Sequence, residues 1–339
     1  MANRSERILY IGTAEGLYQA APDNGGYKFS PSGLQGRGAL RAPVVIDRSD
    51  PRRMYAATSR GGMFRSEDRG ETWREINEGI VYKEAWSLAQ HPKTGELVLG
   101  TGPSSIFKSN DGGDSWIDCE ELRNLPETED WTFPGPPHIS HVKGVALCAD
   151  DPKIIFGAIE EGWLIRSKDG GASWENIKAG TEFDSHSVAV MPDDPNVVIA
   201  TSGKSFYKSV DGGDSFVKCA AGLDRRYMAQ AALHPSKPRT LLTAAAAVPP
   251  PFWRRPEGAD TAFYRSDDQG DSWRKLSGGG LPEYFKAAPR AVADDPEDPS
   301  RFLFGMTDGG VWMTEDSGES FRQILAGMPQ VVSIRMAYR

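Results

Sequence analysis

An eight-residue pattern that recurs six times restricts the fold of this 339-residue chain more than any other feature. The pattern reads Ser/Thr-x-Asp-x-Gly-x-Ser/Thr-aromatic, and residues 109–116 (SNDGGDSW) are a clear copy. Each copy lies between two short apolar runs, which predicts a hairpin turn. The Asp carboxylate and the Ser hydroxyl can accept hydrogen bonds from backbone N–H groups, and the Gly can adopt a positive φ. The six aspartates are Asp68, Asp111, Asp169, Asp211, Asp268 and Asp316.

The spacing of these turns predicts the architecture. Successive aspartates lie 42 to 58 residues apart, which suits a four-stranded propeller blade with loops of variable length. We therefore expect one domain over residues 1–339. Its predicted blade segments are approximately 41–79, 84–125, 141–180, 186–222, 227–281, 288–327, and 328–339 joined with 7–30.

The two ends of the chain complete the count of blades. Residues 7–13 and 16–19 match the second and third strands of a repeat, and residues 22–27 stand where its turn should be. This piece lacks an inner strand, which the alternating run 331–336 can supply. The prediction is an all-β, seven-bladed propeller of four-stranded antiparallel blades, closed by pairing N-terminal strands with a C-terminal inner strand. Six blades, with the N-terminal piece outside the ring, is the alternative.

Composition narrows the function classes. The net charge is −8 with acidic and basic residues interleaved, which disfavours nucleic acid as a partner. The N-terminus is polar up to Arg7 and no run of 18 apolar residues occurs, so we expect a cytoplasmic protein without membrane contact. Cys119 and Cys219 occupy positions where other repeats carry Ile or Leu, and Cys148 lies in an apolar run. These positions predict core residues rather than disulfides or metal ligands.

The repeated turn resembles the Asp-box (BNR) repeat of sialidases, sortilin-type receptors and photosystem II stability/assembly-factor-like proteins, and the resemblance spans essentially the whole chain. It implies a propeller of the kind often named glycosyl hydrolase, in which the box is a structural turn on the face opposite any catalytic site. A sialidase would also carry an Arg-Ile-Pro signature, and the nearest match here is Arg41-Ala42-Pro43. Tyr227 and Glu160 could form a nucleophile pair only if the ring brings them together. True sialidase activity is therefore not expected.

The loops expected over the central channel carry the candidate catalytic groups. His138 and His141 precede one inner strand, His186 enters the next, and Glu160 lies in the loop between the second and third strands of the blade between them. Three histidines and a carboxylate form a ligand set for a divalent Zn, Mn or Fe ion, although no local His spacing supports it. The alternative is that these histidines hydrogen-bond loop backbone. The predicted catalytic residues are His141, His186, Glu160 and Tyr227, and the predicted metal ligands are His138, His141, His186 and Glu160.

Cations and aromatic residues are expected on the same face. Arg side chains suit a carboxylate or phosphate group, and Trp rings can stack against a sugar. An ordinary solvated rim is the alternative. The predicted substrate-binding residues are Arg60, Trp131, His138, Lys143, Arg226, Trp253, Arg255 and Lys286.

Two functional hypotheses follow. In the first, which we favour, a pocket at the mouth of the central channel is the active site of a hydrolase or lyase that acts on a small anionic or carbohydrate-like substrate, with or without a metal ion. In the second, the propeller is a non-catalytic scaffold for a peptide or protein. A catalytic pocket should bury the predicted histidines together, whereas a scaffold should leave them scattered and expose aromatic side chains.

Overall fold

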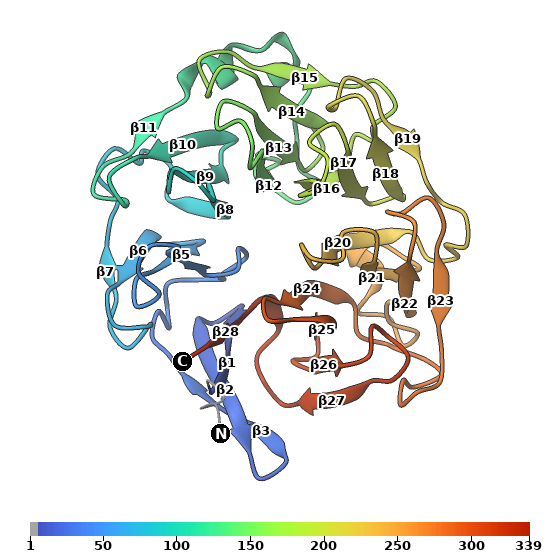
Figure 1. Cartoon of the computed structure of the whole chain (residues 1–339). Helices are drawn as coiled ribbons and strands as arrows, with labels where there is room; N and C mark the ends of the chain where they lie inside the picture. The colour runs from blue at the N-terminus through green and yellow to red at the C-terminus, as the bar shows by residue number, and fades with distance from the viewer. Residues whose placement is uncertain (1–5) are drawn as a thin grey trace. The chain divides into compact units, whose positions relative to one another are not determined.

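The computed structural model describes residues 6–339, so the first part of the polar N-terminal segment lies outside the described residues. Within that range, 28 strands form seven four-stranded antiparallel sheets, which are the blades of a β-propeller (Figure 1). The predicted fold class is confirmed. The helices in this range are three short 3-10 helices, and none is long and apolar enough to cross a membrane.

One compact unit, residues 45–221, contains four of the blades. In each of them the strands follow one another in chain order across the sheet. The strands are β4 (Val45–Ile46), β5 (Met54–Thr58), β6 (Gly62–Ser66) and β7 (Arg74–Glu75); β8 (Glu84–Gln90), β9 (Leu97–Gly102), β10 (Ser105–Ser109) and β11 (Ile117–Asp118); β12 (Val142–Leu147), β13 (Ile155–Ile159), β14 (Leu164–Ser167) and β15 (Glu175–Ile177); and β16 (Ser185–Val190), β17 (Val198–Ser202), β18 (Phe206–Ser209) and β19 (Val217–Lys218).

The other compact unit combines the N-terminal part of the chain, up to Val44, with residues 222–339 and contains three blades. Its strands are β20 (Tyr227–Leu233), β21 (Leu241–Ala246), β22 (Thr261–Ser266) and β23 (Arg274–Leu276); β24 (Pro289–Asp295), β25 (Asp298–Met306), β26 (Val311–Thr314) and β27 (Arg322–Leu325); and β28 (Val331–Tyr338), β1 (Arg7–Thr13), β2 (Leu17–Asp23) and β3 (Gly26–Pro31).

The last of these blades joins the two ends of the chain. Strand β28 pairs with β1 in antiparallel register, with Ile11 opposite Ile334 (Figure 1). The predicted pairing of N-terminal strands with a C-terminal strand is therefore confirmed. Where the other blades carry the repeated turn, β2 and β3 are joined by Asn24 and Gly25, both at positive φ, as a tight two-residue hairpin loop requires.

The repeated turns form the hydrogen bonds that their composition predicts. In the second copy, Asp111 accepts from the Ser115 backbone N–H at 3.0 Å and the Ser115 hydroxyl at 2.6 Å, while the Ser109 hydroxyl accepts from the Gly113 N–H at 2.8 Å. The other five copies repeat the Asp and Ser/Thr bonds. Each turn thus satisfies its own backbone.

The first strands of three neighbouring blades carry β-bulges, and two of the bulged residues belong to the candidate site described below. In β8 the pairing with β9 skips Trp86, in β12 the pairing with β13 skips Lys143, and in β16 the pairing with β17 skips His186. A bulge leaves one residue out of the ladder and re-aims its side chain. Strand β12 contacts both β8 and β16, so the three bulged residues come from adjacent strands.

The remaining cysteines and histidines are largely structural. Cys119 packs in a core cluster beside β13 and β14, as predicted, and Cys148 is buried, whereas Cys219 is half-buried. The buried His91 accepts backbone hydrogen bonds at Nδ1 and lies 3.0 Å from the Cys148 carbonyl oxygen through Nε2. His234 likewise bonds to nearby backbone, at Ser236. These two histidines therefore hold their turns in place.

Candidate functional site

Five ionisable side chains gather in the unit formed by residues 45–221, and we call them the His141 cluster: His141, Lys143, Glu160, Asp184 and His186. They come from three segments. His141 immediately precedes β12 and Lys143 is its bulged residue; Glu160 follows β13; Asp184 precedes β16 and His186 is the bulged residue of that strand. The predicted convergence of His141, Glu160 and His186 from neighbouring segments is therefore present in the structure.

Glu160 is the centre of the cluster. Its Oε2 atom accepts from His141 Nε2 at 2.8 Å and from Lys143 Nζ at 2.9 Å. Beside it, His186 Nε2 donates to Asp184 Oδ1 at 2.9 Å. Glu160 is 7% exposed and His141 and His186 are buried, while Lys143 and Asp184 are half-buried. The accessible groups of the cluster are thus the ammonium of Lys143 and the carboxylate of Asp184. The two imidazoles and the Glu160 carboxylate are buried.

The neighbouring charges control which groups are ionised. Burial favours a raised pKa for Glu160, but Lys143, the hydrogen bond from His141 and the proximity of His186 hold that pKa well below its ordinary value. Burial acts against ionised Asp184 too, and its bond to His186 lowers the pKa. Next to them, burial and repulsion from Asp184 and Glu160 raise the pKa of Glu161. Carboxyls with opposite pKa shifts in one small region are typical of functional sites.

Aromatic rings form one wall of the cluster. The imidazole of His141 stacks on Trp86, with ring centroids 3.3 Å apart and planes 11° from parallel, and Phe133 meets His141 edge-on at 5.0 Å. The stack lies against Gly102 at the end of β9, where a Cβ atom would come within 3.0 Å of Trp86 Nε1 and 3.2 Å of His141 Cβ. A side chain at position 102 would therefore be tight against both side chains of the stack, and Gly leaves the stack undisturbed.

The backbone that presents Glu160 is strained. Glu161 and Trp163 have φ values of 54° and 63°, a backbone region that residues other than Gly seldom adopt. Hydrogen bonds hold this conformation: Thr132 donates to the Glu161 carbonyl at 3.0 Å, and the N–H groups of Gly162 and Trp163 both donate to the Phe183 carbonyl. Strain that is held by surrounding contacts is common where a side chain must be fixed for binding or catalysis.

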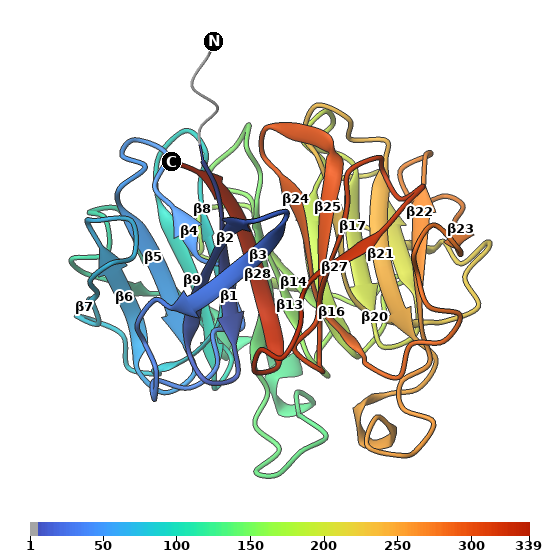
Figure 2. The same cartoon turned by 90° about the horizontal axis from the view of Figure 1, so that it is seen from below.

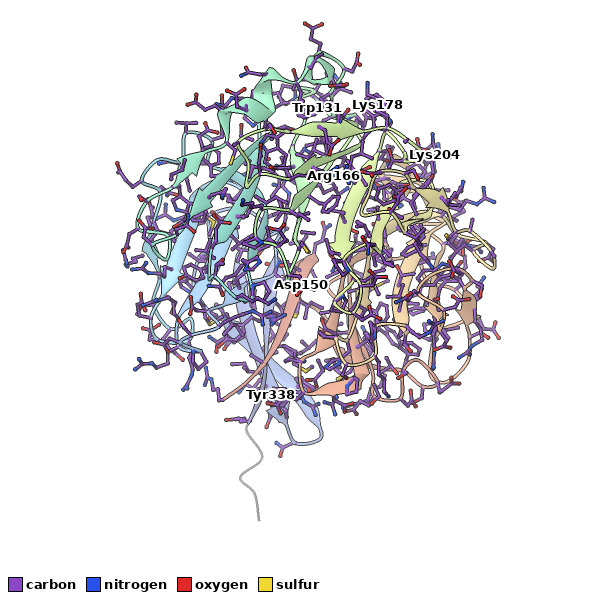
Figure 3. The ribbon with its side chains drawn as sticks, turned by 45° about the horizontal axis from the view of Figure 1, so that its top comes forward. Trp131, Asp150, Arg166, Lys178, Lys204 and Tyr338 are labelled. Carbon is purple, nitrogen blue, oxygen red and sulfur yellow. The ribbon has the colours of Figure 1, made fainter. Side chains whose placement is uncertain are left out.

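The long loop between β11 and β12 carries the other residues predicted for this region. It contains η1 (Glu120–Asn124) and η2 (Pro126–Glu129), and part of it extends beyond the strand ends in Figure 2. Trp131, which is labelled in Figure 3, is 8% exposed and belongs to the core cluster that contains Ile159 and Ile165. His138 is exposed and donates from Nδ1 to the Phe133 carbonyl at 2.8 Å. The roles predicted for these two residues stay predictions.

The remaining predicted residues are spread over both units. Arg60 is exposed in the turn between β5 and β6. In the unit that contains β20, Tyr227 meets Trp253 edge-on at 5.6 Å, and Trp253 donates to the Val248 carbonyl at 2.7 Å. Arg255 stacks on Phe252 of η3 (Pro250–Phe252) at 4.2 Å. Arg226 and Lys286 are exposed. The roles assigned to these residues stay predictions.

The structure adds residues that the sequence analysis did not assign. Asp184 completes the cluster by holding His186, and Trp86 stacks on His141. An Asp two residues before a His at the entry of a strand is a signal that could have identified Asp184. In the other unit, Arg290 lies 4.6 Å over the ring of Trp253, and it is again the bulged residue of a first strand.

The same cluster contains the donors for a metal ion. Among residues 6–339, one group of histidine and acidic side chains brings three ligand atoms within 4.8 Å of one another, and it consists of Glu160, Asp184 and His186. Two of these belong to the predicted metal set. Asp184 is not in that set, and His141 contacts Glu160; the ligand roles predicted for His138 and His141 stay predictions.

The fold and part of the sequence are similar to those of known proteins. The fold and the cluster define a seven-bladed β-propeller with a buried histidine–carboxylate site. The family model described as "Sortilin, neurotensin receptor 3" matches residues 162–278. Over that segment the chain is similar to the sortilin family, and its fold is that of a seven-bladed β-propeller.

Carbohydrate-active propellers are among the relatives. A probable oligoxyloglucan-reducing end-specific xyloglucanase of Neosartorya fischeri is 29% identical over 153 residues, which are 40% of this chain and 17% of that protein. The crystal structure of the GH74 xyloglucanase from Xanthomonas campestris superposes with a TM-score of 0.70 and 17% identity, covering 98% of this chain and 52% of that one. This chain therefore spans under a fifth of the first relative and about half of the second.

A propeller with a peptide ligand has the same fold. The structure of YCF48 bound to D1 peptide gives a TM-score of 0.60 with 14% identity, and the match covers 93% of this chain and 94% of that one. At this level of identity the likeness concerns the fold alone.

Proposed function

We propose that the protein is a hydrolase or lyase that acts on a small anionic or carbohydrate-like substrate at the His141 cluster. One observation carries the proposal: the bonded set of buried His141, buried Glu160 and half-buried Lys143 lies beside the Asp184–His186 pair. Ionisable groups are seldom buried together without a role, because removing their charges from water is unfavourable.

The side chains suit proton transfer next to an anionic group. The imidazoles of His141 and His186 are each held by a carboxylate, which fixes the orientation of the ring. Lys143 at the accessible edge would bind a carboxylate or the developing negative charge of the reaction. Trp86 and Phe133 provide an apolar wall against a sugar ring.

The relatives support the substrate class. Two proteins that this chain resembles are xyloglucanases, so a glycoside is the first substrate class to test. Because the matches cover only part of those enzymes, their activity is an inference for this chain.

The proposal can be tested with a panel of neutral and uronic-acid p-nitrophenyl glycosides and xyloglucan oligosaccharides. We expect turnover of at least one substrate, and we expect His141→Gln to lower kcat/KM by at least about 100-fold. His138→Gln is the matched control, because His138 is exposed and bonded within its own loop. If no substrate is turned over, or if the two variants lose equal activity, the proposed site is wrong.

A non-catalytic peptide- or protein-binding propeller is the alternative. Ile139 favours it, because this side chain is 46% exposed on the loop between β11 and β12. A YCF48 propeller of the same fold is described as bound to D1 peptide. A peptide-binding scaffold would retain its ligand in His141→Gln but lose it in Ile139→Ser, and an affinity measurement on both variants separates the two functions.

A cytoplasmic location is part of the proposal. The buried free thiols of Cys119 and Cys148 support it, since secreted proteins commonly use cysteines in disulfides. Cell fractionation with an antibody against the native chain tests this location.

A further inference from the structure

We propose that Glu160, Asp184 and His186 bind a divalent transition-metal ion. When no metal is bound, the ammonium group of Lys143 pairs with Glu160 in its place. The inference goes beyond the proposed function, because metal binding requires no substrate and no turnover. It also differs from the ligand set expected from the sequence, since it includes Asp184 and omits His138 and His141.

The geometry supports the ligand set. The three ligand atoms lie within 4.8 Å of one another. Ligands at about 2.1 Å from a first-row metal ion are separated by roughly 3 to 4 Å, so small side-chain rotations would complete the site. Two carboxylates and one imidazole suit Mn²⁺, Fe²⁺ or Zn²⁺. The ligands come from fixed positions: the strained turn of Glu160 and the bulged residue His186 with Asp184 just before it.

The charges in the cluster call for an additional cation. The carboxylates of Glu160 and Asp184 lie beside one ammonium, that of Lys143, so one carboxylate charge has no ammonium partner in the cluster. This charge is surrounded by Trp86 and Phe133 on the side of His141, and Glu160 itself is buried. A divalent ion that displaces Lys143 from Glu160 would neutralise both carboxylates, which solvent does less well at a buried position.

Lys143 and the metal compete for Glu160. The ammonium lies 2.9 Å from Glu160 Oε2, so a metal ion on this carboxylate would repel Lys143 toward the accessible edge. His141 would stay bonded to Glu160 and orient it, as a carboxylate partner next to a metal commonly requires. The released Lys143 would then contact an anionic group of the substrate. This last step alone rests on the proposed function.

Isothermal titration of the chelator-treated 339-residue chain with Mn²⁺ and separately with Zn²⁺ tests the inference. We expect one ion per chain for the wild type. Asp184→Asn and His186→Gln should weaken binding at least about tenfold, while Lys143→Met should tighten it about fivefold or more because a competing charge is removed. His138→Gln is the control and should leave the affinity unchanged.

Several results would overturn the inference. The site is refuted if neither Mn²⁺ nor Zn²⁺ binds to the wild type or to Lys143→Met. Equal affinities of the wild type, Asp184→Asn and His186→Gln would refute it too. Weaker binding in His138→Gln would restore the ligand set expected from the sequence. Urea unfolding of each variant verifies that it is folded. Because these titrations contain no substrate, metal binding without turnover refutes only the proposed function, and turnover without metal binding refutes only this site.

Discussion

Replacing Glu160 by Gln should destabilise the protein by about 2 to 3 kcal/mol. The variant keeps the shape of the side chain but removes the charge that Lys143 and His141 contact at 2.9 and 2.8 Å. Removing one partner of a buried ion pair costs about 3 to 5 kcal/mol, because the other charge stays buried without compensation. The Lys143 side chain is 18% exposed, so water offsets part of this loss and places the expected value below that range.

Urea unfolding of wild type, Glu160→Gln, Lys143→Met and the double variant measures this effect. In the double variant the Lys143 ammonium is gone as well, so the stability loss of that variant should be about 1.5 to 2 kcal/mol smaller than the sum of the single losses. Glu182→Gln is the control: its pair with Lys204 has a similar distance, 2.8 Å, but Lys204 is 67% exposed, and we expect a loss below about 1 kcal/mol. Additive losses, or a loss in Glu160→Gln no larger than in the control, would refute the electrostatic interpretation of the cluster.

Three further predictions concern the scaffold. Asp111→Ala removes the acceptor of the Ser115 hydrogen bonds in an exposed turn and should lower the unfolding free energy by about 1 kcal/mol; an unchanged urea midpoint would contradict this. The pKa values of Asp68 and Asp268 are about 2 in the folded protein. At Asp68 hydrogen bonds within its own turn lower the pKa. At Asp268 burial acts to raise the pKa, but the hydrogen bonds of its turn outweigh that effect. Their stabilisation is therefore complete above the unfolded value of about 3.9 and is lost as the pH falls toward 2, so the melting temperature should drop across that window and not between pH 5 and 7. Gly180→Ala should cost more than about 2 kcal/mol, because Gly180 has a φ of 73° and its Cβ would lie 1.8 Å from the Phe216 carbonyl oxygen; calorimetric stability equal to wild type would show that this turn can relax.

The fold was predictable because each blade carries its own local signal. The repeated turn places a carboxylate, a hydroxyl and a glycine at fixed positions, and these satisfy the turn without help from distant residues. The pairing of β28 with β1 followed from counting strands at both ends. The turn at Asn24 and Gly25 differs from the others, since a two-residue hairpin needs only two residues at positive φ.

The candidate site was predictable in part. Assigning His141, Glu160 and His186 to loop positions was enough to bring them together, because their place in the repeat decides their place in the sheet. The bulges at Lys143 and His186 were not visible, since a one-residue shift in pairing leaves no mark in the sequence pattern. Trp131 was expected to stack against a substrate, but its indole fills the core beside Ile159, and apolar size alone could not distinguish these environments.

The most direct test of the His141 cluster as the functional site is a comparison of kcat and KM for Lys143→Met and Lys204→Met on the best glycoside substrate. Lys143 contacts the central carboxylate, whereas Lys204 pairs with Glu182 at the surface. The predicted result is a loss of kcat/KM of at least about 100-fold in Lys143→Met and less than about twofold in Lys204→Met. Equal activity in both variants would contradict the assignment of function to this cluster.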